Sequence, residues 1–312
     1  MSEKYYITED DGENLSFNYS YKTIFYHDIK GNRGLPEYAV IEKFVTEPEN
    51  MKAAILETLL FIQKFQFASI SQIRTMLERK EIAIDAQELL DKCVQEFMLN
   101  YFIIARYDLG EIPEDAFKVY CLDTRAVFIL SHFSTVDMVS WLTSDNIRCV
   151  ELVTKYMATG KFFTELYAAN KDALRDFTPV FNANIGRRMM RFSASFKLVN
   201  GYTPLNYIFE VVRSYDLPGP WQKKVSEQMS VFDQEKCWHR YFDIKPYYVF
   251  MTENEEQALE TAEIFYRLTE NRNFLLLLDS MVTENLKTTA LLAYDPDTRE
   301  LVSGDKICFS KQ

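Results

Sequence analysis

The spacing of apolar residues predicts three successive helices in the first half of the chain. Residues 52–65, 69–80 and 85–100 each repeat apolar side chains three or four positions apart, so that these side chains share one helical face. Two β-prone segments follow, residues 101–107 and 117–122, and the loop between them contains a glycine and a proline. Three helices followed by a hairpin is the order of a winged helix-turn-helix.

The apolar pattern after this hairpin remains helical for about forty residues. It predicts short helices at residues 124–133 and 138–142 and a longer amphipathic helix at residues 146–166. Residues 167–185 contain a proline and several asparagines, which favour a loop or a boundary.

From residue 186 onward, strand and helix patterns alternate. The predicted elements are a hairpin at 191–212, a helix at 221–234, a strand at 246–251, a helix at 255–268, a strand at 274–278, and further strands at 290–294 and near 301 or 307. The order of a hairpin, a helix, a strand, a helix and a strand is typical of an α/β domain with a mixed sheet.

We therefore predict an α+β protein in four parts: an N-terminal arm (1–50), a winged helix domain (51–135), a helical connector (136–185) and an α/β domain (186–312). The arm has no helical period and contains two aromatic, β-prone segments. It is interpreted as an arm or hairpin docked on the body, and the alternative is a partly disordered leader.

The composition argues against several classes of protein, among them membrane, secreted and metal-binding proteins. The chain of 312 residues has 35 basic and 46 acidic side chains and a net charge of −11, which opposes nucleic-acid binding unless basic residues gather locally. We find no apolar run of membrane-spanning length and no secretory or transit signal, so we expect a cytoplasmic protein. The five cysteines and three histidines are scattered, which predicts neither a disulfide framework nor a metal site, and we expect no cofactor.

The predicted third helix is a poor DNA-reading helix. It carries four acidic residues against Lys92 alone, and an acidic helix repels phosphate. The preceding helix is more favourable, with Arg74, Arg79 and Lys80. The alternative is that the winged helix domain serves in dimerisation or domain packing. The candidate partners are therefore DNA, another protein or a second copy of this chain.

A basic stretch in the α/β domain is the second candidate site. No acidic residue lies between Asp176 and Glu210, although the chain as a whole is acidic. Aromatic residues are interleaved with the basic ones, a pattern that suits a polyanion surface. The alternative is a solvated face whose charges pair with acidic residues elsewhere. The basic residues are Arg187, Arg188, Arg191, Lys197, Arg213, Lys223 and Lys224.

Glu210 is the candidate catalytic residue if the protein is a nuclease. A strand-borne carboxylate with a nearby basic residue is how metal-dependent nucleases hold a magnesium ion and activate water. The adjoining strand supplies no second carboxylate, and Arg213 is a poor base. A second acid would have to come from one of three residues elsewhere in the chain, Asp172, Asp176 or Asp243. The alternative is an ion pair of Glu210 with Arg213 or Lys223.

Several segments together resemble the replication-relaxation family of plasmids and other mobile elements of Gram-positive bacteria. The segment VYCLDTRAVFIL (119–130) resembles a family strand that runs into a glycine-containing helix, with Ala126 in place of the glycine. FEVVR (209–213) resembles a strand that ends in Glu with an Arg nearby, and WQKKVSEQM (221–229) resembles the helix that follows. The resemblance spans residues 52–294.

This resemblance implies a restriction-endonuclease-like fold for the C-terminal half, with Lys223 or Lys224 as the family's lysine. RFSASFKL (191–198) has Ser193-Ala194 where the family usually has Pro-Asp, which implies the loss of a catalytic acid. We therefore predict a non-enzymatic DNA-associated protein of a mobile element, acting in replication, transfer or regulation. The alternatives are a protein-interaction module or homodimeric scaffold, and a Mg²⁺-dependent nuclease.

Overall fold

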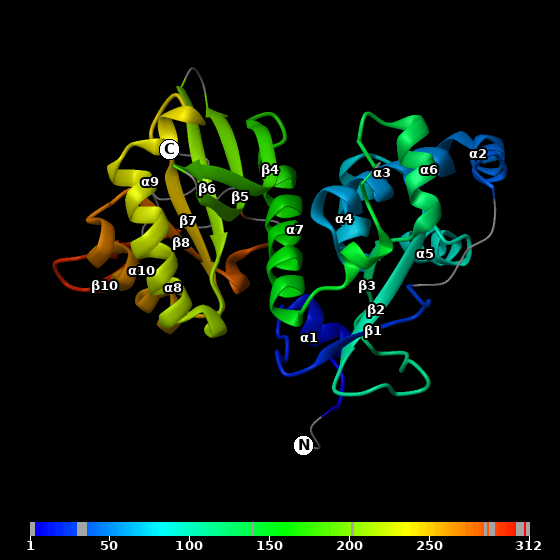
Figure 1. Ribbon diagram of the computed structural model, residues 1–312, viewed down its shortest axis with the longest axis horizontal. Helices are drawn as coiled ribbons and strands as arrows, with labels where there is room; N and C mark the ends of the chain where they lie inside the picture. Colours follow the sequence, from blue (N-terminus) through cyan, green and yellow to red (C-terminus); the bar gives the residue numbers. More distant parts are fainter. Residues whose placement is uncertain are drawn as a thin grey trace. The chain divides into compact units, whose positions relative to one another are not determined.

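The computed structural model describes residues 4–29, 36–138, 140–186, 188–200, 203–283, 286, 291–303 and 309. The chain forms two compact units, residues 1–160 and residues 161–312, which we call unit 1 and unit 2 (Figure 1). The division into four parts made from the sequence remains a prediction.

Unit 1 combines helices with a three-stranded antiparallel sheet of order β1-β2-β3. The strands are β1 (Lys22–Phe25), β2 (Leu99–Ala105) and β3 (Val119–Leu122). The helices are α1 (Glu9–Glu13), α2 (Glu37–Thr46), α3 (Glu49–Phe65), α4 (Ile70–Arg79), α5 (Ala86–Gln95) and α6 (Thr124–Phe133), with a 3-10 turn at Thr143–Asn146.

The predicted helices α3 and α4 form for local reasons. Ile55, Leu59 and Ile62 of α3 are fully buried, as their spacing predicts. Ser69 caps α4 in a capping box, in which the Ser69 side chain accepts the Gln72 N–H and the Gln72 side chain accepts the Ser69 N–H. The winged helix-turn-helix itself remains a prediction.

Unit 2 is built on a seven-stranded mixed sheet of order β10-β9-β8-β7-β6-β5-β4. Strands β6, β7 and β8 are parallel to one another, and the other neighbours pair antiparallel. The strands are β4 (Leu174–Ile185), β5 (Arg188–Asn200), β6 (Thr203–Val211), β7 (Tyr247–Thr252), β8 (Phe274–Leu278), β9 (Leu292–Asp295) and β10 (Glu300–Ser303).

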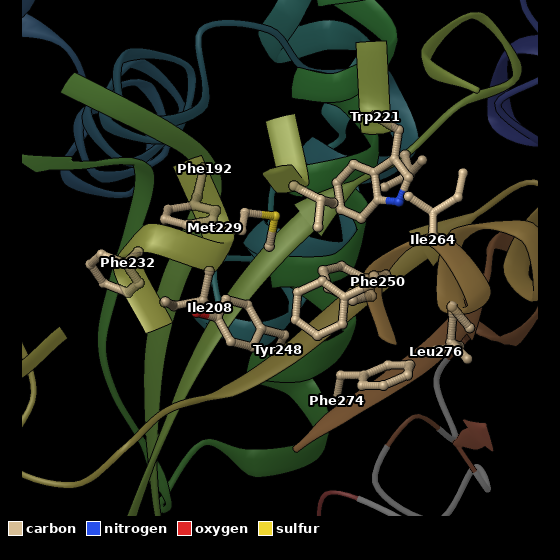
Figure 2. Packing of buried hydrophobic residues seen from close by; sticks show 14 of the residues in the cluster. Phe192, Ile208, Trp221, Met229, Phe232, Tyr248, Phe250, Ile264, Phe274 and Leu276 are labelled. Atoms are coloured by element: carbon tan, nitrogen blue, oxygen red, sulfur yellow. The ribbon is translucent and has the colours of Figure 1, made fainter. Parts of the chain in front are cut away.

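Helices of unit 2 lie against both faces of this sheet. On one face, α8 (Gly219–Lys224), a π-helical turn (Val225–Met229), α9 (Ser230–Gln234) and α10 (Glu255–Thr269) enclose an apolar cluster (Figure 2). On the other face, Phe162 of α7 (Val150–Asn170) stacks on Phe209 at 4.1 Å between ring centroids. None of the described helices is both long and apolar enough to cross a membrane.

Three predictions about the elements are wrong. Residues 167–185, predicted as a loop, contain the end of α7 and all of β4, an edge strand that accommodates Pro179 because only one side of it pairs. Residues 138–142, predicted as a helix, form none over the positions that the structure describes. The N-terminal arm, predicted to have no helical period, contains the helices α1 and α2, although its strand β1 pairs with β2 and so is docked as predicted.

Candidate functional site

The candidate site in unit 2 lies where strands β5 and β6 separate, at Ser193 and Glu210; we call this point the fork. The two strands pair regularly from Asn200 and Thr203 up to Ala194 and Phe209. Beyond that pair, side chains replace the backbone ladder. The Ser193 N–H donates to Oε2 of Glu210 at 3.0 Å, and the Val211 N–H donates to Oγ of Ser193 at 3.0 Å. The fork is therefore held open without leaving these N–H groups unsatisfied.

Glu210 is buried in the fork and paired with Lys224. The Lys224 Nζ lies 2.6 Å from Oε1 of Glu210, whose side chain is only 4% exposed. The same Nζ donates to the carbonyl oxygen of Arg191 at 2.9 Å and lies 5.5 Å from the centroid of the Phe192 ring. The predicted ion pair of Glu210 thus exists, but the partners named for it, Arg213 and Lys223, are wrong.

Helix α8 brings Lys224 to the fork because Trp221 anchors the helix. The Trp221 side chain is 2% exposed in the apolar cluster of Figure 2, and its Nε1 donates to the carbonyl oxygen of Thr261 at 3.2 Å. Lys224 is three positions after Trp221 and so lies on the same side of the helix, whereas Lys223 is exposed.

Arg213 forms a second buried ion pair in unit 2, near the carboxyl ends of the parallel strands. Its side chain is fully buried, so the prediction that it contributes to an exposed basic surface is wrong. Its Nη1 lies 2.5 Å from Oδ2 of Asp279, the residue directly after β8. Among the described residues, nothing hydrogen-bonds to Nε or Nη2 of Arg213 or to Oδ1 of Asp279.

The environment of Asp279 shifts its protonation equilibrium. Burial raises the pKa of Asp279 above its ordinary value of 3.8, although the charge of Arg213 acts in the opposite direction. The negative charge of Glu253, directly after β7, raises the pKa further. This cluster was not predicted from the sequence; the available signal was a charged residue within two positions after each of three predicted strands.

The remaining basic residues of the predicted nucleic-acid site lie partly in unit 2 and partly in unit 1. Arg188 and Arg191 on β5 and Lys223 on α8 are exposed, and Lys197 is half-buried. Arg187 lies outside the described residues. In unit 1, Arg74 and Arg79 lie on α4, and Lys80 directly follows it. All three side chains are exposed, and Lys80 is paired with Glu57.

Helix α5 remains acidic in the folded protein. Its basic residue, Lys92, lies 2.7 Å from a Glu47 carboxylate oxygen and 3.0 Å from one of Glu96. Glu88 and Asp91 are exposed. The helix therefore presents negative charge to solvent, as the sequence predicts.

The fork does not fit a divalent metal ion. One carboxylate oxygen of Glu210 is bound to the Lys224 ammonium and the other accepts the Ser193 N–H. No group of three metal-ligating side chains occurs in the described part of the chain. The acids considered as second ligands, Asp172, Asp176 and Asp243, are all exposed, unlike Glu210.

Comparisons with known proteins identify no family. No protein-family model matches the chain, and no curated protein matches it. A solved structure of the restriction endonuclease FokI is similar over 75% of this chain, with 13% identity and a TM-score of 0.30. The match covers 42% of that longer protein. The assignment to the replication-relaxation family remains a prediction.

Proposed function

We propose that the protein associates with DNA and does not cleave it. Unit 2 contacts phosphates through a basic surface that we define as Arg188, Arg191 and Lys223. The observation that carries this proposal is the hydrogen bond from Lys224 to the Arg191 carbonyl, which joins the end of α8 to β5. Exposed basic side chains lie on both of these segments, beside strands that carry no acidic residue between Asp176 and Glu210.

This surface suits the phosphate backbone better than the bases. Two aromatic residues that the sequence places among the basic ones, Phe192 and Trp221, are 1% and 2% exposed, so they are not free to stack on bases. The charged groups remain, and such contacts bind duplex DNA without reading its sequence.

The geometry of the fork supports the proposal that the protein does not cleave DNA. A metal-dependent nuclease needs carboxylate oxygens that are free to hold the ion. Both oxygens of Glu210 are engaged, one by Lys224 and the other by Ser193. The link to plasmids or other mobile elements rests on the sequence resemblance alone.

A second candidate function concerns unit 1. The exposed negative charge of α5 favours a protein partner over DNA for this unit, as in a protein-interaction module or a homodimer. A winged helix used in this way would complement DNA association by unit 2.

Charge reversal tests the location of the phosphate contacts. Arg188, Arg191 and Lys223 are changed together to Glu, and retention on immobilised duplex DNA is measured at low salt. The matched control reverses the same number of charges in unit 1, at Arg74, Arg79 and Lys80. We expect the first variant to lose retention and the second to keep it. Unchanged retention by the first variant would refute the proposal.

A further inference from the structure

Two oxygen atoms at the strand fork contact the Lys224 ammonium, and both are of the kind that bind metal ions. The ammonium contacts the carboxylate oxygen Oε1 of Glu210 at 2.6 Å and the carbonyl oxygen of Arg191 at 2.9 Å. A carboxylate and a backbone carbonyl are both oxygen ligands that Mg²⁺, Mn²⁺ and Ca²⁺ accept. We propose that the fork is a cation site whose cation is the protein's own Lys224 ammonium, and that replacing this ammonium by a neutral group creates a divalent-cation site.

Burial makes a positive charge at this position necessary. The Glu210 side chain is 4% exposed, and an unpaired carboxylate in such a place is strongly unfavourable. The Ser193 N–H satisfies only Oε2 and brings no net charge. Arg213, which is buried in the described part of unit 2, is paired with Asp279. Lys224 therefore supplies the counter-charge at Oε1.

The two sides of this ion pair differ in their access to water. The Lys224 side chain is 22% exposed, so that Lys224, unlike Glu210, lies partly at the surface. A small divalent ion could then bind Oε1 of Glu210 and the Arg191 carbonyl. Water molecules would complete its coordination shell, as they commonly do for Mg²⁺ and Mn²⁺.

Substitution of Lys224 by Met provides the test, because Met keeps an unbranched apolar chain beside Phe192 and removes the ammonium. Mn²⁺ alone is titrated against the full-length protein, with free Mn²⁺ followed by electron paramagnetic resonance. We expect Lys224→Met to bind one Mn²⁺ per chain at this site and the wild-type protein to lack this binding. Thermal unfolding of Lys224→Met should shift to higher temperature with Mn²⁺.

The double variant Lys224→Met/Glu210→Gln is the matched control, because it removes the carboxylate as well and leaves a neutral fork. It should show neither the Mn²⁺ binding nor the thermal shift. A folded Lys224→Met that binds no more Mn²⁺ than the wild type would overturn the proposal. Binding that persists in the double variant would also overturn it.

Failure of Lys224→Met to fold by itself leaves the test decisive, because the protein can then be refolded with and without Mn²⁺. Recovery that requires Mn²⁺ and Glu210 supports the proposal. A single variant that stays unfolded with Mn²⁺, beside a double variant that folds, contradicts it. No DNA is present in these measurements, so their result is separate from that of the DNA-retention experiment.

Discussion

The carboxylate of Glu210 accepts the backbone N–H of Ser193 at 3.0 Å, at the position where β5 and β6 would otherwise continue their ladder. The Glu210 side chain therefore replaces a backbone carbonyl as the acceptor, and the strands separate without leaving the Ser193 N–H unsatisfied. The sequence shows Ser193-Ala194 where the resembled family usually has Pro-Asp. In this protein, Ser193 maintains the fork through its main chain and its hydroxyl.

Replacing Ser193 by Ala should weaken the fork modestly. The change removes the hydroxyl oxygen that accepts the Val211 N–H, at a cost of about 1 kcal/mol in the free energy of unfolding. Chemical denaturation measures this difference. Ser195→Ala, in the regularly paired part of β5, is the control and should change stability less. Equal effects of the two substitutions would contradict the role given to the Ser193 hydroxyl.

Neutralising Lys224 should lower the free energy of unfolding more than neutralising Glu210. Lys224→Met leaves a carboxylate in a site that is 4% exposed, and we expect a loss of about 3–5 kcal/mol in metal-free buffer. Glu210→Gln leaves an ammonium that can turn toward water, so we expect a smaller loss of about 1–2 kcal/mol. The double variant should recover part of the larger loss. Additive losses in this double-mutant cycle would show that the pair is not coupled.

Asp279 should make stability depend on pH in the acidic range. Because its folded-state pKa lies above the ordinary 3.8, the folded protein binds more protons than the unfolded chain between these two values. The contribution of Asp279 to the free energy of unfolding therefore falls as the pH rises through that window. Denaturation of wild type and Asp279→Asn from pH 4 upward, at about 0.5-unit steps, measures this effect. The wild-type stability minus that of the variant should decrease and then level off, whereas an increase would refute the raised pKa.

Where the local pattern determines an element, the sequence predicted it well. Helix α6 begins at Thr124, after the capping residue Asp123, and ends at Phe133, the bounds predicted from the sequence. The all-apolar FLLLL forms β8 within the parallel part of the sheet, as its composition indicates. Strand β4 was missed because Pro179 and the asparagines in its sequence favour a loop, and its pairing with β5 overrides that local preference.

The candidate site was only partly predictable. Glu210 was identified from the sequence as a carboxylate on a hairpin strand, but its partner depended on the orientation of α8. The spacing of Trp221 and Lys224 could have selected Lys224 over Lys223, because residues three apart share a helical face. The pairing of Arg213 with Asp279 was not predictable in the same way, since it requires the strand order of the folded sheet.

The central claim, DNA association through phosphate contacts, is tested most directly by fluorescence anisotropy of a labelled generic duplex titrated with the protein at several salt concentrations. We predict binding at low salt that weakens steeply as salt rises, because each phosphate contact contributes a slope of roughly 0.9 in log affinity against log salt. The variant with Arg188, Arg191 and Lys223 changed to Glu should bind far more weakly. Absence of wild-type binding even at low salt would contradict the account and turn attention to protein partners of the acidic helix α5.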